Sequence, residues 1–299
     1  MAIENLPPAP QLAKLDASRL VITESTNKKE LPENPHFGEV KTDHMLVVNY
    51  EPKTGWSAPE IKPYGPLSLD PASSCFHYCP NVFEGMKPFD KHEVLKLIRT
   101  LVALDDRWVP TKEGHSLYIR PTIIGTRAAL GVAASDSAML FVMMTPTRPY
   151  FQIDAKGLPL LAVGKTVRSW PGGTGGYKLG LNYAPGIQPQ REATAKGYAQ
   201  ILWLLGDDEK ITEAGAMNFF AVVQREDGDL DIVTPPLDGT ILPGITRRSA
   251  LELLEAHTAK QTVLPGIPSA QRLHTHERAV TMHDLAAWSE EGKLLEAFC

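Results

Sequence analysis

The sequence predicts a mixed α and β fold in two domains, and three observations support this class. The 299 residues suffice for two cores of ordinary size. Segments with strand patterning alternate with segments of helical spacing, and two prolines in residues 146–151 disfavour regular structure near mid-chain. We therefore expect an N-terminal arm (1–40), a small domain (41–145), a linker (146–158) and a larger domain (159–299).

The expected elements of the small domain are strands around one long helix. Strand patterning covers 44–50, 117–124 and 138–145, a turn is expected at 52–55, and 73–87 favours a second extended run. Asp90 is placed to cap a helix with apolar residues at helical spacing. These residues are Val94, Leu95, Leu97, Ile98, Leu101 and Val102. In the larger domain, strands at 159–163, 199–205 and 219–224 alternate with short helices.

Composition excludes several classes of protein. The hydrophobic fraction of 43% and net charge of −5 describe a soluble globular protein without the basic footprint of nucleic-acid binding. Three cysteines suggest a reducing compartment, and no apolar run approaches the roughly 18 residues of a membrane span. The first thirty residues hold a single arginine, Arg19, and four acidic residues, a poor match to an Arg-rich transit peptide. We expect a cytoplasmic protein.

Residues 171–178, Pro-Gly-Gly-Thr-Gly-Gly-Tyr-Lys, place a lysine after a glycine-dense loop. Lys178 could be a surface lysine, a phosphate-loop lysine or an amine nucleophile toward a carbonyl cofactor. The phosphate loop fits poorly, because Tyr177 stands where glycine is needed and Leu179 where Ser or Thr is needed. The other two readings remain open from this loop alone.

Two further stretches accompany this lysine. Glu213 is one carboxylate in an apolar run and needs a partner if it is buried; a protonated pyridine nitrogen would be one such partner. Gly244, Ile245 and Thr246 resemble a helix start that can bind an anion. Lysine, carboxylate and phosphate cradle in that order are what a pyridoxal phosphate (PLP) enzyme requires.

Other candidate sites are weaker. Cys75, His77 and Cys79 alternate, so a strand would place them on one face, but a zinc site lacks a fourth ligand nearby. We therefore expect no metal. His274, His276 and His283 lie in a polar stretch that favours exposed loop residues over ligands.

Several more stretches carry a family resemblance. They are 36–38 with 42–45, 76–78 with 83–87, 117–122, 130–132 and 149–151. With the three stretches above, they resemble the branched-chain-amino-acid aminotransferases of the eukaryotic type, in the fold-type IV class of PLP enzymes. The resemblance runs nearly end to end. It implies a small N-terminal α/β domain, a larger C-terminal domain with a barrel-like sheet, and a cofactor between them.

The resemblance implies a role for each matching cofactor residue. Lys178 would form a Schiff base with PLP and then move the proton between the substrate Cα and the cofactor C4′ carbon. Glu213 would keep the pyridine nitrogen protonated, and Tyr183 would hydrogen-bond the 3′ oxygen. The backbone N–H groups of Ile245 and Thr246 would bind the phosphate.

The resemblance also implies how substrates are bound. Arg120, with Tyr78 and Tyr118, would orient the substrate carboxylate. The apolar pocket would be lined by Phe37, Tyr78, Phe83, Tyr118, Tyr150, Ala216 (where a threonine is usual) and Val132 of the partner subunit. The substrates would be leucine, isoleucine and valine, with 2-oxoglutarate and glutamate as the other pair, and the protein would be a homodimer.

Two departures from the family pattern predict a weakened phosphate site. Lys87 runs directly into Pro88, without the hairpin and helix that carry a phosphate-binding arginine in the family, and the chain stops at Cys299, before a Gly-Thr-Ala turn. Losing one charge-assisted hydrogen bond costs about 1.5–3 kcal/mol. One alternative hypothesis is therefore an impaired isoform that acts only by pairing with an intact subunit. Another is a related fold-type IV enzyme, a D-amino acid aminotransferase or an aminodeoxychorismate lyase.

Overall fold

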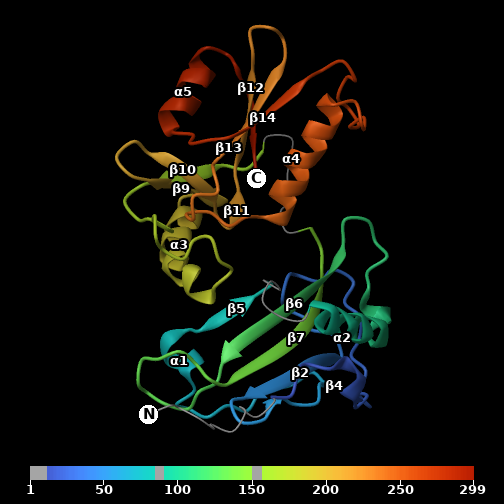
Figure 1. Ribbon diagram of the computed structural model, residues 1–299. Coiled ribbons are helices and arrows are strands. Elements are labelled where there is room, and N and C mark those ends of the chain that lie inside the picture. The colour runs from blue at the N-terminus through green and yellow to red at the C-terminus, as the bar shows by residue number, and fades with distance from the viewer. Residues whose placement is uncertain (1–11, 85–90, 150–156) are drawn as a thin grey trace, which may run out of the picture. The chain divides into compact units, whose positions relative to one another are not determined.

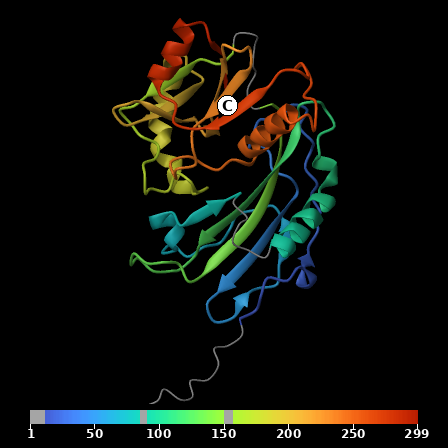
Figure 2. The same ribbon diagram turned by 45° about the horizontal axis from the view of Figure 1, so that its top comes forward.

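The chain divides into two compact units, shown in the computed structural model of Figures 1 and 2. The structure describes residues 12–84, 91–149 and 157–299. The first unit takes in residues 1–152 and 179–181, and the second takes in 153–178 and 182–299. Each unit combines helices with β-sheet, which confirms the predicted mixed class. Within the described residues, no helix has the length and apolar character to cross a bilayer.

A seven-stranded sheet forms the centre of the first unit, in the order β1-β4-β2-β7-β6-β5, with β3 paired to β2. Its strands are β1 (Val21–Ile22), β2 (His44–Glu51), β3 (Gly55–Trp56), β4 (Glu60–Pro63), β5 (Asn81–Phe83), β6 (Ser116–Gly125) and β7 (Ala138–Thr147). All pairings are antiparallel except that of β1 with β4. The strands predicted at 44–50, 117–124 and 138–145 are confirmed as β2, β6 and β7.

Helix α2 (Lys91–Leu104) packs its apolar stripe against one face of this sheet (Figure 2). The buried side chains of the helix are those of Val94, Leu97, Ile98 and Leu101, and they join the core of Leu46, Val48, Leu140 and Val142. Burying each such side chain contributes about 1.5–3 kcal/mol. The predicted helix is confirmed, and its predicted cap Asp90 lies outside the described residues.

The predicted extended run at 73–87 is wrong for residues 74–78, which form helix α1 (Ser74–Tyr78). The Ser74 N–H donates to the Arg127 carbonyl and the Ser74 hydroxyl donates to the Gly125 carbonyl. These bonds fix the helix to the end of β6 and override the local preference for extended structure. Cys79, with φ of 50°, ends the helix. Residues 85–87 lie outside the described chain.

The helical conformation of α1 also removes the basis for a zinc site there. Residues two apart on a helix point about 200° apart, so Cys75 and His77 do not share a face as they would on a strand. Among the described residues, no three His, Cys, Asp or Glu side chains gather as a metal-binding group.

Strand β7 continues through Pro146 and Thr147, where irregular structure was predicted. Pro146 pairs with Leu117 of β6, while the pairing with β2 ends at Val142. A proline is tolerated where only one neighbouring strand pairs, because its missing N–H then breaks no second ladder.

The second unit contains two four-stranded sheets that share one core. The first, β11-β10-β9-β8, comprises β8 (Leu160–Val163), β9 (Gln200–Leu205), β10 (Lys210–Ala214) and β11 (Met217–Asn218). The second, β14-β13-β12-β15, comprises β12 (Phe220–Gln224), β13 (Leu230–Thr234), β14 (Leu273–Glu277) and β15 (Leu294–Phe298). Leu202 and Leu204 pack with Ala221 and Val223. The strands predicted at 159–163, 199–205 and 219–224 are confirmed.

The helices of the second unit are α3 (Ile187–Ala195), α4 (Ile245–Thr258) and α5 (Met282–Glu290). The described residues also form four short 3-10 helices: η1 (Ala17–Arg19), η2 (Asp106–Trp108), η3 (Gly180–Asn182) and η4 (Ala184–Gly186). The loop predicted for His274 and His276 is wrong, because both lie on β14 and pair with Asp229 and Asp231 of the neighbouring segment. His283 lies in the first turn of α5.

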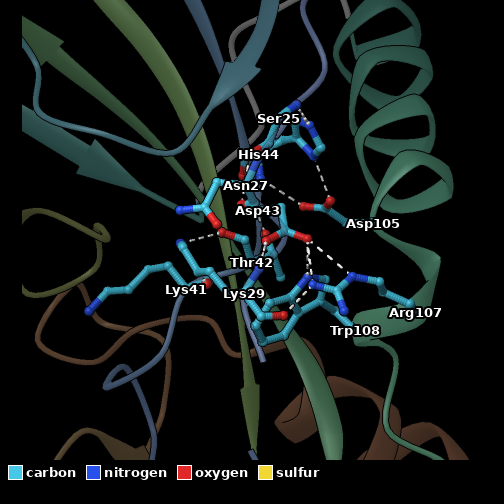
Figure 3. A network of polar contacts seen from close by, with 10 residues as sticks. All are labelled: Ser25, Asn27, Lys29, Lys41, Thr42, Asp43, His44, Asp105, Arg107 and Trp108. Atoms are coloured by element: carbon cyan, nitrogen blue, oxygen red, sulfur yellow. Dashed lines mark hydrogen bonds and ion pairs between the residues drawn. The ribbon is translucent and has the colours of Figure 1, made fainter. Parts of the chain in front are cut away.

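A buried polar network bonds residues 25–29 of the predicted arm to the sheet of the first unit (Figure 3). The Ser25 N–H donates to His44 Nε2, and the Lys29 N–H donates to Asp43 Oδ1. Arg107 donates to both the Asp43 carboxylate and the Lys29 carbonyl. This part of the arm is thus packed structure.

Candidate active site

Lys178 follows a loop of the second unit that is closed by hydrogen bonds. Asn182 is buried and its Nδ2 donates to the carbonyls of Thr174 (2.9 Å) and Tyr177 (2.8 Å). A Cβ on Gly175 would lie 2.5 Å from the Thr240 carbonyl oxygen, so only glycine fits this close approach. Lys178 itself is half-buried, with Nζ 5.3 Å from the ring centroid of Tyr183. Because the loop before it is fixed and its side chain is half-buried, Lys178 is better explained as a functional lysine than as an ordinary surface lysine.

Glu213 lies on β10 and is buried, with 1% of its side chain exposed. Its Oε2 lies 2.8 Å from Arg168 NH2, and its Oε1 accepts the Leu242 N–H at 2.8 Å. Burial raises the pKa of Glu213, while Arg168, the Leu242 N–H and Lys178 act in the opposite direction. Lys178 is therefore close enough to Glu213 to act on its carboxylate electrostatically.

Asn218 links Glu213 to the segment that leads into α4. Its Nδ2 donates to the Leu242 carbonyl at 2.8 Å and lies 3.4 Å from Glu213 Oε1. Helix α4 then begins after Gly244, which has no side chain to cap it. The first N–H groups of a helix have no intrahelical acceptors and carry the positive end of its dipole. Ile245 and Thr246 are exposed at this end, so an anion has access to it.

A second group of predicted residues meets within the first unit. The rings of Phe37 and Tyr118 pack edge to face, with centroids 4.8 Å apart. The Arg120 guanidinium lies over the rings of Phe83 (4.8 Å) and Tyr118 (5.1 Å). Its Nε donates to Glu84 at 2.9 Å and its NH2 donates to the Tyr118 hydroxyl at 3.1 Å. An arginine held in one orientation suits bidentate binding of a carboxylate.

The remaining predicted residues are placed differently. The Tyr78 hydroxyl donates to the Leu130 carbonyl, which ties α1 to the loop that carries Val132. Val132 is 85% exposed in the single chain. Ala216 is exposed in the turn between β10 and β11. Tyr150 lies outside the described residues.

Arg168, Asn218 and Glu84 were missed as site residues by the sequence reasoning. A buried carboxylate at position 213 requires a cationic partner, and this requirement alone could have directed attention to the arginines. It could not have selected Arg168, which precedes Glu213 by 45 residues and reaches it only through the fold.

Comparison with known proteins decides the family. Residues 77–290 match the amino-transferase class IV family. The chain belongs to the class IV aminotransferases. One relative is the mitochondrial branched-chain-amino-acid aminotransferase of Schizosaccharomyces pombe. It is 44% identical in sequence, and the alignment covers 95% of this chain and 72% of the relative. The cytosolic enzyme of Saccharomyces cerevisiae is 41% identical over 96% of this chain and 83% of the relative.

Solved structures confirm the fold-type IV architecture of this class IV aminotransferase. A branched-chain aminotransferase of Thermoproteus uzoniensis with norvaline superposes with a TM-score of 0.61 at 22% identity, over 85% of this chain and 82% of that chain. The Escherichia coli branched-chain amino acid aminotransferase gives a TM-score of 0.57 at 22% identity, over 80% of this chain and 79% of that chain.

The alignment with the Schizosaccharomyces pombe relative is longer than this class IV aminotransferase itself. It spans 317 positions, whereas the chain has 299 residues. The relative thus carries residues inside the aligned region that have no counterpart here. The location of a missing segment after Lys87 stays a prediction from the motifs.

Proposed function

We propose that the chain is a PLP-dependent branched-chain-amino-acid aminotransferase that exchanges the amino group of leucine, isoleucine or valine with 2-oxoglutarate. The observation that carries the proposal is the grouping of Lys178, Glu213 and the start of α4 in one unit. The relatives that are about 40% identical over almost the whole chain are named for this activity.

The residues of the second unit fit PLP in three respects. Glu213 Oε2 and Arg168 NH1 are buried and have no hydrogen-bond partner among the described residues, so an acceptor is available to a protonated ring nitrogen. The exposed N-terminus of α4 suits a phosphate. Lys178 supplies the amine. Lys178, Tyr183, Glu213, Ile245 and Thr246 would therefore hold the cofactor, which supplies an electron sink when it is bound.

Each of these residues then has a defined task. Lys178 Nζ would accept the proton from the substrate Cα and hold it for return to the cofactor. The Glu213 carboxylate would keep the ring nitrogen protonated, and the Tyr183 hydroxyl would donate to the cofactor's 3′ oxygen. The N–H groups of Ile245 and Thr246 would bind the phosphate. Because these donors and charges are already in position, the site needs no reorganisation when charge develops in the transition state, and the reaction is faster.

Substrate recognition is assigned to the aromatic group around Arg120. We propose that Arg120 binds the substrate carboxylate, supported by Tyr118 and Tyr78. The apolar side chain of the substrate would contact Phe37, Phe83, Tyr118, Tyr150, Ala216 and Val132 of the partner subunit. Val132 is 85% exposed in the single chain, so it is accessible to a second subunit in the proposed homodimer.

The compartment is part of the proposal. The relatives include cytosolic and mitochondrial enzymes, and we propose the cytoplasm, a reducing compartment that suits the three free cysteines. Cell fractionation tests this assignment.

An absorbance spectrum with added PLP tests the cofactor assignment. The purified protein is expected to develop the absorbance band of a Schiff base between the cofactor and a lysine, and borohydride should then fix the cofactor on Lys178. The variant Lys178→Ala should show neither change. Absence of the band in the wild-type chain would contradict the proposal.

A substrate panel tests the reaction. Transfer from L-leucine to 2-oxoglutarate is expected, and preference for D-leucine would instead identify a D-amino acid aminotransferase. A chain that is silent alone but active when mixed with an intact homologue would identify the impaired isoform.

A further inference from the structure

Arg168 and Glu213 form an ion pair that is closed to solvent. The exposed fractions of the two side chains are 6% and 1%, and Arg168 NH2 lies 2.8 Å from Glu213 Oε2. A buried carboxylate without a cation would take up a proton instead of staying ionised. The pairing therefore determines the charge of the group that the proposed function places at the cofactor ring.

The two carboxylate oxygens of Glu213 have different surroundings. Oε1 accepts the Leu242 N–H at 2.8 Å and lies 3.4 Å from Asn218 Nδ2. Oε2 faces Arg168 but accepts no hydrogen bond of normal geometry from the described residues, and Arg168 NH1 likewise has none. An ionised carboxylate oxygen can accept more than one donor. Oε2 thus keeps acceptor capacity for a further N–H donor.

Arg168 is held in place by the residue that follows it. Ser169 is buried, and its hydroxyl donates to the Thr240 carbonyl. A Cβ on Gly175 would lie 2.6 Å from Ser169 Cβ, so the loop that leads to Lys178 packs closely on the same point. Arg168, the lysine loop and the segment before α4 therefore form one framework inside the second unit.

We propose that Arg168 is a positioning residue that holds Glu213 ionised and oriented toward the ring nitrogen of the cofactor. The inference rests on the proposed function for the identity of the cofactor. Arg168 touches neither cofactor nor substrate in this role and acts through Glu213. A pyridinium N–H is a donor that the free capacity of Glu213 Oε2 would satisfy.

The pH dependence of stability without cofactor tests the pairing directly. The variants are Arg168→Met, Arg168→Lys, Glu213→Gln and the double variant Arg168→Met/Glu213→Gln. Arg168→Met should lower the unfolding midpoint by about 5 °C or more at pH 8. Removing the cation raises the pKa of Glu213 further, so stability present at low pH is lost as pH rises through that pKa. The difference in unfolding midpoint between wild type and Arg168→Met should therefore become smaller toward pH 5.

The double variant and the charge-conserving variant are the matched controls. Arg168→Met/Glu213→Gln should recover much of the loss at pH 8 and lose its pH dependence, and Arg168→Lys should retain most of the stability. If Arg168→Met does not fold while the double variant does, the pairing is supported. A deficit of Arg168→Met that is equal at pH 5 and pH 8, and is unchanged by Glu213→Gln, would overturn the proposal.

Cofactor affinity separates this proposal from the proposed function. The dissociation constant of PLP should rise about tenfold or more in Arg168→Met, the effect of losing about one charged hydrogen bond, and less than about threefold in Arg168→Lys. Wild-type protein that binds no PLP contradicts the proposed function. Wild-type protein that binds PLP with an affinity equal to that of Arg168→Met contradicts the role of Arg168.

Discussion

The imidazole of His44 and the carboxylate of Asp105 form a hydrogen bond of 2.7 Å between two fully buried side chains (Figure 3). The Ser25 N–H donates to the other ring nitrogen, Nε2, at 2.8 Å. Nε2 therefore carries no proton, and the Nδ1–H is the donor to Asp105. The second Asp105 oxygen accepts the His44 backbone N–H at 3.0 Å. One side chain thus joins the N-terminal segment, the start of β2 and the end of α2.

Replacing His44 should destabilise the protein. In His44→Ala, Asp105 loses its imidazole donor and keeps only the backbone N–H of residue 44, Ser25 loses its acceptor and a cavity remains. We therefore expect a loss of about 2–4 kcal/mol. Urea unfolding of the purified protein measures this loss. The exposed His283 provides the control, and His283→Ala should stay within about 0.5 kcal/mol of wild type. A loss below about 1 kcal/mol in His44→Ala would show that the network contributes little.

Asp43 should make stability depend on acid pH. Burial raises the pKa of Asp43, but hydrogen bonds from the Lys29 N–H, Arg107 and Trp108 outweigh it and lower the pKa from 3.8 to about 2. Because the folded pKa is the lower one, Asp43 contributes stability above pH 3.8 that is lost as pH falls toward 2. The contribution is about 2 kcal/mol.

The variant Asp43→Asn tests this contribution. The gap in unfolding free energy between wild type and Asp43→Asn should narrow by about 1.5 kcal/mol between pH 5 and pH 2.5. At pH 2.5 the Asp43 carboxyl is mostly protonated in the unfolded chain, whereas the folded protein, with a pKa of about 2, must still keep it ionised. Asp207→Asn, at an exposed position, should show a constant gap. A constant gap for Asp43→Asn as well would rule out the lowered pKa.

Periodicity predicted the regular elements because local spacing determines which face is buried. Helix α2 and strand β7 follow directly from Val94, Leu97, Ile98 and Leu101 and from the apolar run at 138–145. Helix α1 did not follow, because Ser74 is fixed by carbonyls at 125 and 127 that are distant in sequence. Local patterns carry no information about such partners.

The site shows the same division between local and long-range information. Lys178 and Gly244 lie in short stretches whose composition indicates their chemistry. Arg168 lies in an ordinary stretch and gains its place only when Ser169 bonds to Thr240, 71 residues later. The sequence therefore predicts that Glu213 has a cationic partner, but it does not identify that partner as Arg168.

A side chain at position 244 should collide with Asn218. The φ of Gly244, −65°, is ordinary, but a Cβ there would lie 2.2 Å from Asn218 Oδ1. Gly244→Ala should displace the Asn218 side chain and disturb the Leu242 segment before α4. We expect PLP affinity to fall about tenfold and stability to fall by about 1–2 kcal/mol, as is usual for overpacking.

A double variant tests whether this contact is the cause. If Asn218→Ala removes the obstacle, adding Gly244→Ala to it should change PLP affinity by less than about twofold, because the two changes are then not additive. Fluorescence titration with PLP measures the affinities. If the losses of PLP affinity in the two single variants add up in the double variant, the effect of Gly244→Ala does not arise from its contact with Asn218.

Arg120 should control substrate affinity and leave cofactor affinity unchanged. Its guanidinium is held by Glu84 (2.9 Å), by the Tyr118 hydroxyl (3.1 Å) and by the ring of Phe83 (4.8 Å). Little conformational freedom of the side chain is therefore lost when it binds a carboxylate. Arg120→Met removes a charged hydrogen-bond donor worth about 1.5–3 kcal/mol. We therefore expect kcat/KM for leucine to fall about 10- to 100-fold.

Tyr118→Phe is a milder variant for comparison with Arg120→Met, since it removes only the hydroxyl that Arg120 NH2 contacts. Its kcat/KM should fall by less than about tenfold, in keeping with one neutral hydrogen bond of about 0.5–1.5 kcal/mol. PLP titration should give the wild-type affinity for both variants, because the residues assigned to the cofactor are Lys178, Glu213 and the start of α4. A matched fall in PLP affinity, or an unchanged kcat/KM in Arg120→Met, would refute the assignment of Arg120 to the substrate carboxylate.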